Sequence, residues 1–388
     1  YSYMDIKQPM IQTDENWKTL CSFFPPGWRS KAFELGACRR LRAFSSVDEL
    51  LRMLLVHLAE GFSLKQTCAI AAQAGWADIS SVSLMKRLKN ASGWLRWMAR
   101  ELIIQHHPAQ VSLQRPDWLA GRRVKSIDAS VVSEPGSTGT NWRLHYCLEL
   151  FDLHCEQLTL SDHRVGEKVA NFDFTAGDLV IGDRAYCNAK AFGELAEQQV
   201  DWLFRYKHRS FGIAGVCSTR QEAELLVFLE ALAPLTAGEQ ELNVKAGSSE
   251  LPLRLIGIRK SKQAREKARR AYRYNQSRKQ KPVNKKTLLL QDYIIVVTSL
   301  SKSLVSAAQL LELYRLRWQI EIAFKRLKSI FGLGHLPKHD PQSCRAWLHG
   351  KLLIALLVDV IVEEARLFSP WGYPLASETK QKLTVERK

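Results

Sequence analysis

The chain has 388 residues, more than one ordinary hydrophobic core accommodates, so two or three domains are expected. Its 56 Lys and Arg residues against 39 Asp and Glu residues give a formal net charge of +17 and a pI near 9.6. A large basic protein of ordinary apolar content usually meets a polyanion, so nucleic acid is the first expected partner and an anionic membrane the second. A generic basic surface is the alternative.

The cysteines and apolar runs exclude several classes of protein. Eight cysteines occur without a C-x-x-C pair, which argues against zinc and a disulfide framework and for a reducing cytoplasm. The longest apolar run, residues 352–362, contains Asp359 and is too short to span a bilayer. The first residues lack the apolar segment of a signal peptide. A membrane role is therefore not expected.

Residues 1–115 are predicted to form an all-α domain. Residues 50–59 have helical apolar spacing, and two short helices, 63–75 and 81–89, flank a break at Gly75. The second of these carries three cations, Lys86, Arg87 and Lys89. Two short helices around a glycine break resemble a helix-turn-helix, which predicts a DNA-binding domain. An ordinary helical subdomain with a basic face is the alternative.

From about residue 120 the pattern changes to β. Short strands are predicted over residues 124–132, 142–151, 157–161, 178–182 and 201–207, with a helix over 188–198. Three meandering strands followed by strand, helix and strand is the order of a ribonuclease H-like α/β fold, a mixed sheet flanked by helices. Residues 120–207 are therefore predicted to be the first part of such a core.

Residues 208–291 are predicted to be a β-rich, basic insertion that interrupts this core. Two strand-like stretches precede residues 259–286, which are rich in Lys and Arg and contain Glu266 as their single acid. A run this basic is usually a solvated surface or a mobile arm. Tyr272 and Tyr274 stand among the cations, so contact with a nucleic-acid backbone is the preferred interpretation.

Residues 292–388 are predicted to hold the second part of the core and the C-terminal helices. A strand over 292–298 is followed by one helix over 314–328, which has no Gly or Pro, and by a final helix over 342–366. At ~100° per residue, the polar side chains of the 314–328 helix form a stripe about 60° wide opposite an apolar arc. The stripe consists of Tyr314, Arg317, Glu321 and Lys328. A carboxylate among cations and a phenol could hold a metal ion against a phosphate.

Two further acids stand at strand ends. Asp128 lies in the first strand of the core, and Asp183 directly follows the buried strand 178–182. Each has a structural alternative, because Asp128 could cap a turn and Asp183 could pair with Arg184. In a sheet of this order the first and fourth strands are neighbours, and the long helix could bring Glu321 to the same edge. Three carboxylates without His or Cys suit Mg²⁺ or Mn²⁺.

The order of these features resembles the bacterial insertion-sequence transposases of family four, in the DDE superfamily. The resemblance rests on the spacing Tyr314-x2-Arg317-x3-Glu321-x6-Lys328, on Asp128 and Asp183 in their sequence contexts, and on the basic insertion that lies between Asp183 and Tyr314. It covers about residues 45–365.

For the chemistry, the resemblance implies a DDE transposase that performs cut-and-paste transposition. Asp128, Asp183 and Glu321 would bind two divalent ions, Mg²⁺ with Mn²⁺ as a substitute. Such ions activate water to hydrolyse the element ends and then the freed 3′-hydroxyl to join target DNA. The implied partners are double-stranded DNA (terminal inverted repeats and target) and a second copy of the chain, in a homodimer at the bacterial nucleoid.

For DNA contact, the resemblance implies five further residues. Tyr314, Arg317 and Lys328 match positions that hold the phosphates of the element end and its flipped base. Tyr293, which starts a strand, could stack on that base or pack within the sheet. Arg184 could contact a phosphate or form an ion pair.

Two other functions stay open. A metal-dependent nuclease on the same fold would cut DNA without joining it and would not need the insertion. A degenerate, non-catalytic copy would bind DNA as a repressor. The presence of all three acids argues against degeneracy, although the lack of an initiator Met leaves room for it.

Overall fold

The structure is a computed structural model that describes residues 14–105, 115–134, 136, 141–212, 218–247, 249–329, 332, 336 and 340–367. The chain divides into two compact units. The helical unit comprises Tyr1–Pro108, Ser133–Ser137 and Arg326–Lys388, and the sheet unit comprises Ala109–Val132 and Thr138–Lys325. Each unit is described by itself below.

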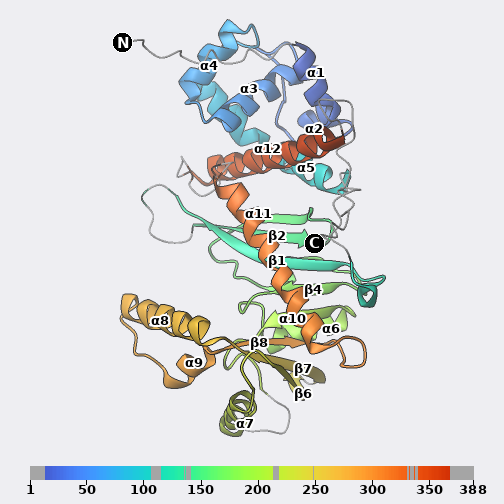
Figure 1. The fold of residues 1–388 in the computed structure, drawn as a ribbon. Helices are drawn as coiled ribbons and strands as arrows, with labels where there is room; N and C mark the ends of the chain where they lie inside the picture. Colours follow the sequence, from blue (N-terminus) through green and yellow to red (C-terminus); the bar gives the residue numbers. More distant parts are fainter. Residues whose placement is uncertain are drawn as a thin grey trace, which may run out of the picture. The chain divides into compact units, whose positions relative to one another are not determined.

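The helical unit contains helices from both ends of the chain (Figure 1). They are α1 (Asp14–Ser22), α2 (Trp28–Glu34), α3 (Val47–Glu60), α4 (Leu64–Gln73), α5 (Ser81–Gln105) and α12 (Pro341–Leu367). α3 begins at a capping box between Ser46 and Glu49, which satisfies two backbone N–H groups that the first helical turn leaves unpaired. In the core, Trp94 stacks on Trp28 with 6.0 Å between ring centroids.

The helix predicted over residues 81–89 is much longer in the structure, because α5 continues to Gln105. Two of its three cations make contacts within the unit. Arg87 donates to the carbonyl of Arg40 at 2.8 Å, and Lys89 pairs with Asp340 at 3.0 Å. Of the three, Lys86 is exposed and the other two are half-buried, which weakens the argument for DNA binding by this face. Among the described residues, no helix combines the length and the apolar character needed to cross a bilayer.

The described strands of the sheet unit form one eight-stranded sheet in the order β3-β2-β1-β4-β5-β8-β7-β6. The bounds are β1 (Val124–Val132), β2 (Trp142–Glu149), β3 (Cys155–Asp162), β4 (Leu179–Gly182), β5 (Asp201–Arg205), β6 (Ala237–Ala246), β7 (Ser249–Arg259) and β8 (Tyr293–Thr298). β1 pairs antiparallel with β2 and parallel with β4, and β4 pairs parallel with β5. This mixed sheet with flanking helices fits the α/β fold expected from sequence.

Helices cover both faces of this sheet. The helices of the unit are α6 (Ala189–Glu197), α7 (Ser218–Glu230), α8 (Lys262–Arg278), α9 (Lys285–Leu290), α10 (Ala307–Leu316) and the start of α11 (Trp318–Ser329). Phe192 of α6 and Leu229 of α7 join one hydrophobic core with Ile127 of β1. On the opposite face, Phe324 of α11 packs edge-on against Tyr146 of β2. Figure 1 shows α10 and α11 running across the strands on that face.

Two expectations differ from the structure. The described residues of the segment 208–291 form three helices beside a hairpin, and β6 and β7 continue the core sheet through β8 instead of forming a separate β-rich body. The single helix expected over 314–328 is broken at Arg317. There the backbone bonds span three residues, from Arg317 N–H to the Tyr314 carbonyl and from Ile320 N–H to the Arg317 carbonyl, both at 3.2 Å.

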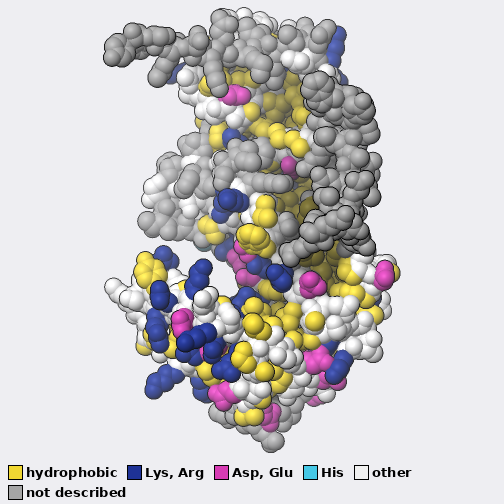
Figure 2. All heavy atoms as spheres, viewed as in Figure 1, with side chains coloured by type: hydrophobic (Ala, Val, Ile, Leu, Met, Phe, Trp, Pro, Cys, Tyr) yellow, Lys and Arg dark blue, Asp and Glu magenta, His cyan; other side chains and the backbone are white. Residues whose placement is uncertain are grey.

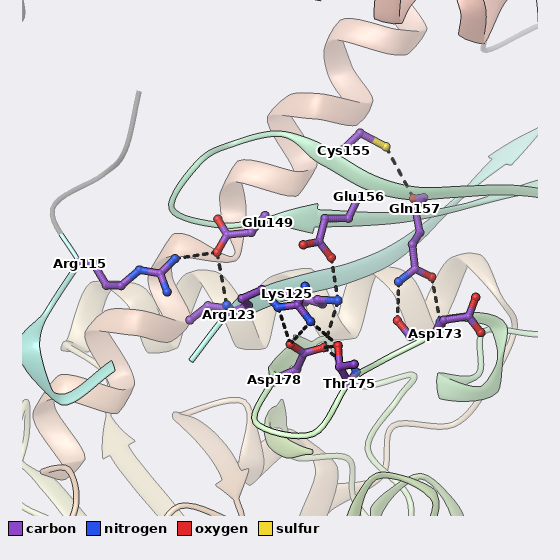
Figure 3. Close-up of polar contacts among 11 residues, drawn as sticks. Arg115, Arg123, Lys125, Glu149, Cys155, Glu156, Gln157, Asp173, Thr175 and Asp178 are labelled. Carbon is purple, nitrogen blue, oxygen red and sulfur yellow. Dashed lines mark hydrogen bonds and ion pairs between the residues drawn. The ribbon is translucent and has the colours of Figure 1, made fainter. Parts of the chain in front are cut away.

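A buried network of ion pairs fixes the start of β1 against β4 (Figure 3). Lys125, 4% exposed, lies 2.8 Å from Glu156 and 3.0 Å from Asp178, which is 1% exposed. Arg123 reaches the same Asp178 carboxylate at 3.0 Å, and Thr175 donates its backbone N–H to it at 2.8 Å. Because these contacts hold the two strands at one end, they also set the register at the other end, where the predicted acids stand.

Candidate active site

The parallel pairing of β1 and β4 brings Asp128 and Asp183 to one edge of the sheet. Ser126 is the register partner of Ile181, and the two aspartates each follow two residues later. The Asp128 carboxylate accepts the Ala129 N–H at 2.7 Å. Asp183 accepts the Ala185 N–H at the same distance, in the turn that ends β4.

The environment of Asp128 disfavours its charged form. Burial raises the pKa of Asp128 to about 6, and the charges of Asp183 and Glu167 act in the same direction. The Ala129 N–H and the Arg317 guanidinium oppose them. Burial and Asp183 also raise the pKa of Glu167. Three acids therefore interact electrostatically at this edge.

Arg317, at the break between α10 and α11, links two of the predicted acids. Its guanidinium lies 3.7 Å from the Asp128 carboxylate and 2.5 Å from the Glu321 carboxylate. Tyr314 is buried, unlike the exposed position that the predicted stripe implied, and its hydroxyl donates to the Gly182 carbonyl at 3.4 Å. The break lets Arg317 face β1 while Tyr314 packs beside the end of β4.

The structure thus connects Asp128, Asp183 and Glu321 only in part. Asp128 and Asp183 interact electrostatically just beyond the last paired residues of β1 and β4, whereas Glu321 is 46% exposed and bound to Arg317. In the part of the chain that is described, no three His, Cys, Asp or Glu side chains are close enough together to hold a metal ion. Lys328 is exposed near the end of α11 and falls in the helical unit.

A basic pocket of about 300 Å³ brings together the other two predicted DNA contacts, Arg184 and Tyr293. Its wall also includes Arg205, Lys207 and His208. Tyr293 is 2% exposed, so most of its ring packs within the sheet. Burial lowers the pKa of Arg184, and the neighbouring Arg205 charge adds to this. Crowded cations of this kind favour an anionic ligand.

Sequence reasoning missed several residues of this region. Glu167 lies in the loop after β3 and interacts electrostatically with Asp183. Tyr186 is buried, and its hydroxyl interacts electrostatically with Asp128 and Asp183. The Tyr186 hydroxyl has no hydrogen-bond partner among the described atoms. Lys260 interacts electrostatically with Arg205 and Arg184 of the pocket, and burial together with these two charges lowers its pKa to about 8. Tyr186 ends the Gly-Asp-Arg-Ala-Tyr stretch around Asp183, which could have pointed to it. Glu167 and Lys260 have no local motif, although the polar stretch 161–164 lies just before Glu167.

The chain is similar in sequence to several known proteins, and these belong to one class. A family profile described as a transposase DDE domain matches residues 152–357. The transposase for insertion sequence element IS421 of Escherichia coli is 30% identical over 374 residues, covering 93% of this chain and 98% of that protein. The InsL protein for insertion sequence element IS186A of E. coli strain K12 is 30% identical over 373 residues, with the same coverage.

A more distant relative extends the comparison. The transposase for insertion sequence element IS231C of Bacillus thuringiensis subsp. berliner is 23% identical over 355 residues, covering 83% of this chain and 74% of that protein. The profile spans more than half of the chain, and the E. coli relatives are covered almost completely. The chain therefore belongs to the DDE transposases of insertion sequences.

Proposed function

We propose that this protein catalyses cut-and-paste transposition of an insertion sequence, cutting the element ends and joining the freed 3′-hydroxyl to target DNA. The observation that carries the proposal is the parallel β1–β4 pairing, which brings Asp128 and Asp183 to one edge where Arg317 and Glu321 arrive from α10 and α11. Membership of the transposase family supports the class of reaction, and Asp128, Asp183 and Glu321 are the proposed catalytic residues.

Asp128, Asp183 and Glu321 are proposed to hold a pair of Mg²⁺ ions, for which Mn²⁺ can substitute. Their fit rests on the donor set, which is oxygen only, and on the mutual repulsion that raises the pKa of Asp128, since bound cations would relieve it. Such ions supply activation of the attacking oxygen and stabilisation of the leaving oxygen. Arg317 already balances the charge of two of these acids, and it is proposed to turn to the scissile phosphate when DNA is bound.

Double-stranded DNA is the proposed partner, as element end and as target. Tyr314 and Lys328 are proposed to act with Arg317 on the backbone near the cut. Arg184 and Tyr293 are proposed to take a nucleotide phosphate in the basic pocket, where Arg205 adds charge. The sheet unit is the proposed catalytic part, the helical unit is proposed to add DNA contacts, and a homodimer is the proposed active assembly.

The test replaces each acid by its amide and follows DNA cutting. Removing outer groups that orient a metal ligand typically costs ~10–100-fold, so Asp128→Asn, Asp183→Asn and Glu321→Gln should each lower the cutting rate by more than ~100-fold. Binding of a labelled element end should stay near the parental level, because the amide keeps the volume. The reaction contains Mg²⁺, a labelled end and a target plasmid. Near-parental cutting by any amide variant would remove that residue from the site.

The same assay separates the alternatives. Joined product supports a transposase, and cutting without joining supports a metal-dependent nuclease. Binding without cutting supports a repressor. A matched control is Asp173→Asn. Asp173 lies in the loop before β4 and forms no ion pair with any residue that the structure describes, so this variant should cut at the parental rate.

A further inference from the structure

Helix α8 is the most basic element of the sheet unit. It spans Lys262–Arg278 and contains seven Lys and Arg residues with Glu266 as its single acid. Ser261 caps its start by accepting the Ala264 N–H at 3.3 Å. None of its residues is buried, so hydrophobic packing does not hold this helix in place.

One buried carboxylate anchors the helix instead. Asp292, 2% exposed, lies just before β8 and binds Arg269 through two contacts of 2.6 and 2.5 Å. Arg265, one turn earlier, lies 4.0 Å from the same carboxylate. Lys260, just before the helix, donates its backbone N–H to the Asp292 carbonyl at 2.9 Å and its ammonium to the Gln291 carbonyl at 2.6 Å. Polar contacts to residues 291 and 292 therefore attach α8 to the sheet.

Because Asp292 binds Arg265 and Arg269, the cations of α8 fall into two groups on different faces of the helix. At ~100° per residue, Arg265 and Arg269 fall on one side, and the partly buried residues of the helix share it. The remaining cations occupy an arc of about 160° on the other side and are exposed: Lys262, Lys267, Arg270, Arg273 and Arg278. None of these five pairs with an acid among the described residues. Figure 2 shows the dark-blue side chains gathered where Figure 1 draws α8.

We infer that α8 binds the backbone of duplex DNA with this outer face and that Asp292 is the residue that positions it. The inference rests on the proposed function, which supplies DNA as the polyanion. Seventeen residues extend over ~25 Å, and one DNA strand presents a phosphate every ~3.4 Å, so several cations can meet phosphates at once. A single-stranded ligand is disfavoured because stacking platforms use several aromatics, and Tyr274 alone is widely exposed here.

The first test neutralises the outer face with Arg270→Gln and Arg273→Gln in the full chain. The control carries Lys190→Gln and Lys302→Gln, which are 79% and 69% exposed and remove the same charge. Binding to a labelled duplex is measured from 50 to 200 mM salt. Each lost phosphate contact lowers the slope of log K against log salt by ~0.9, so the α8 variant should lose ~1.8. A slope equal to that of the control overturns the inference.

The second test releases the anchor with Asp292→Asn, which makes the protein more positive by one charge. If only the net charge of the protein attracted DNA, the variant would bind DNA equally or more tightly. If DNA binding requires α8 to be held in place by Asp292, the variant binds more weakly. We expect binding at least several-fold weaker than parental, measured at a temperature where far-ultraviolet circular dichroism shows the variant to be folded. Equal or tighter binding by the folded variant overturns the role of Asp292. Should the variant not fold, the outer-face test still decides whether α8 contacts DNA.

The two proposals fail separately. If the parental protein binds duplex DNA with the α8-dependent slope but cuts no element end, the proposed function fails and the α8 surface stands. If cutting occurs and the slope of the α8 variant matches the control, the α8 surface fails alone. Preference of the α8 face for single-stranded DNA or RNA over duplex also overturns the choice of partner.

Discussion

His145 illustrates how burial sets the charge of a single residue beside the candidate site. It lies on β2, 1% exposed, as the register partner of Ala129. Its Nε2 contacts the Ser161 hydroxyl at 2.8 Å and its Nδ1 contacts the Asn171 amide at 3.3 Å. Burial lowers the pKa of His145 to about 4, and the Arg143 charge adds to the shift. The imidazole is therefore held neutral at pH 7.

This shift predicts a pH dependence of stability. The folded-state pKa of about 4 lies below the ordinary histidine value of 6.5 that the unfolded chain has, so the stabilisation is complete above pH 6.5 and is lost as pH falls toward 4. The loss should be on the order of 2 kcal/mol. Urea unfolding of the parental protein and of His145→Gln between pH 7.5 and 4 measures it. The variant should lose less stability over this range, and parallel curves would contradict the prediction.

The sequence indicated some residues of the candidate site and not others, for physical reasons. Asp128 and Asp183 drew attention because Asp128 lies within an apolar strand and Asp183 directly follows one, and an isolated charge at such a position is costly. Tyr314 was placed on the exposed stripe, but it is buried beside Gly182, because tertiary packing overrides the helical wheel. Glu167 lies in a loop, so no periodic pattern brings it to the aspartates.

At the scale of elements, the local signals were strongest where a strand is bounded by turns. The predicted limits of β1, residues 124–132, match the structure, and the pairing of β1 with β4 follows from strand order. The break at Arg317 could not be predicted from local sequence, since its neighbours all favour a helix and the contact to Asp128 is long-range. The union of β7 with β8 likewise depends on distant pairing.

The ion network at the start of β1 gives an element-scale prediction. Burial lowers the pKa of Lys125, but the hydrogen bonds and charges of Glu156 and Asp178 outweigh it, so the pKa is raised. Lys125→Met removes this cation and leaves buried acids short of a partner, which typically costs ~3–5 kcal/mol. Urea unfolding measures the loss. The control Lys190→Met, at a site that is 79% exposed, should change stability by less than ~0.5 kcal/mol.

The expected loss is large because Asp178 is almost completely enclosed. Arg123 still contacts Asp178 in the variant, so a value at the lower end of the range is expected. A change below ~1 kcal/mol would mean that the network adds little to the β1–β4 register.

At the scale of the whole molecule, the chain ends contribute to one helical unit. Residues 292–388 were expected to hold the second part of the core and the C-terminal helices, with the final helix carrying a dimer contact or finishing the core. In the structure α12 packs against α3 and α5 of the helical unit. Amphipathic spacing predicts that α12 buries one face, but it does not identify the partner. Contacts between residues about 250 positions apart, such as Ser92 with His349 at 3.0 Å, have no local signature.

Gly350 tests this packing of α12 on α3. A Cβ at Gly350 would lie 2.3 Å from Leu58 Cδ1 and 3.1 Å from Leu58 Cγ, and Leu58 is fully buried. Overpacking costs ~1–3 kcal/mol, which exceeds the gain of ~0.5–1 kcal/mol that Ala offers over Gly within a helix. Gly350→Ala should therefore destabilise the protein.

A matched control for this change lies in α5. Gly93 is also helical, but a Cβ there meets no atom within 4 Å, so Gly93→Ala should stabilise by ~0.5–1 kcal/mol. Thermal unfolding followed by circular dichroism compares the two variants. Equal shifts of the same sign would contradict close packing of α12 on α3.

The sheet order also has a consequence for synthesis on the ribosome. β5 ends at Arg205 and its neighbour β8 begins at Tyr293, so 87 residues (206–292) must be translated between them. At ~5–20 residues per second, this takes ~4–17 s, during which the nascent chain presents an unpaired β5 edge that invites aggregation. A premature stop codon within that interval would leave the edge permanently open, so truncated products should depend on chaperones or be degraded.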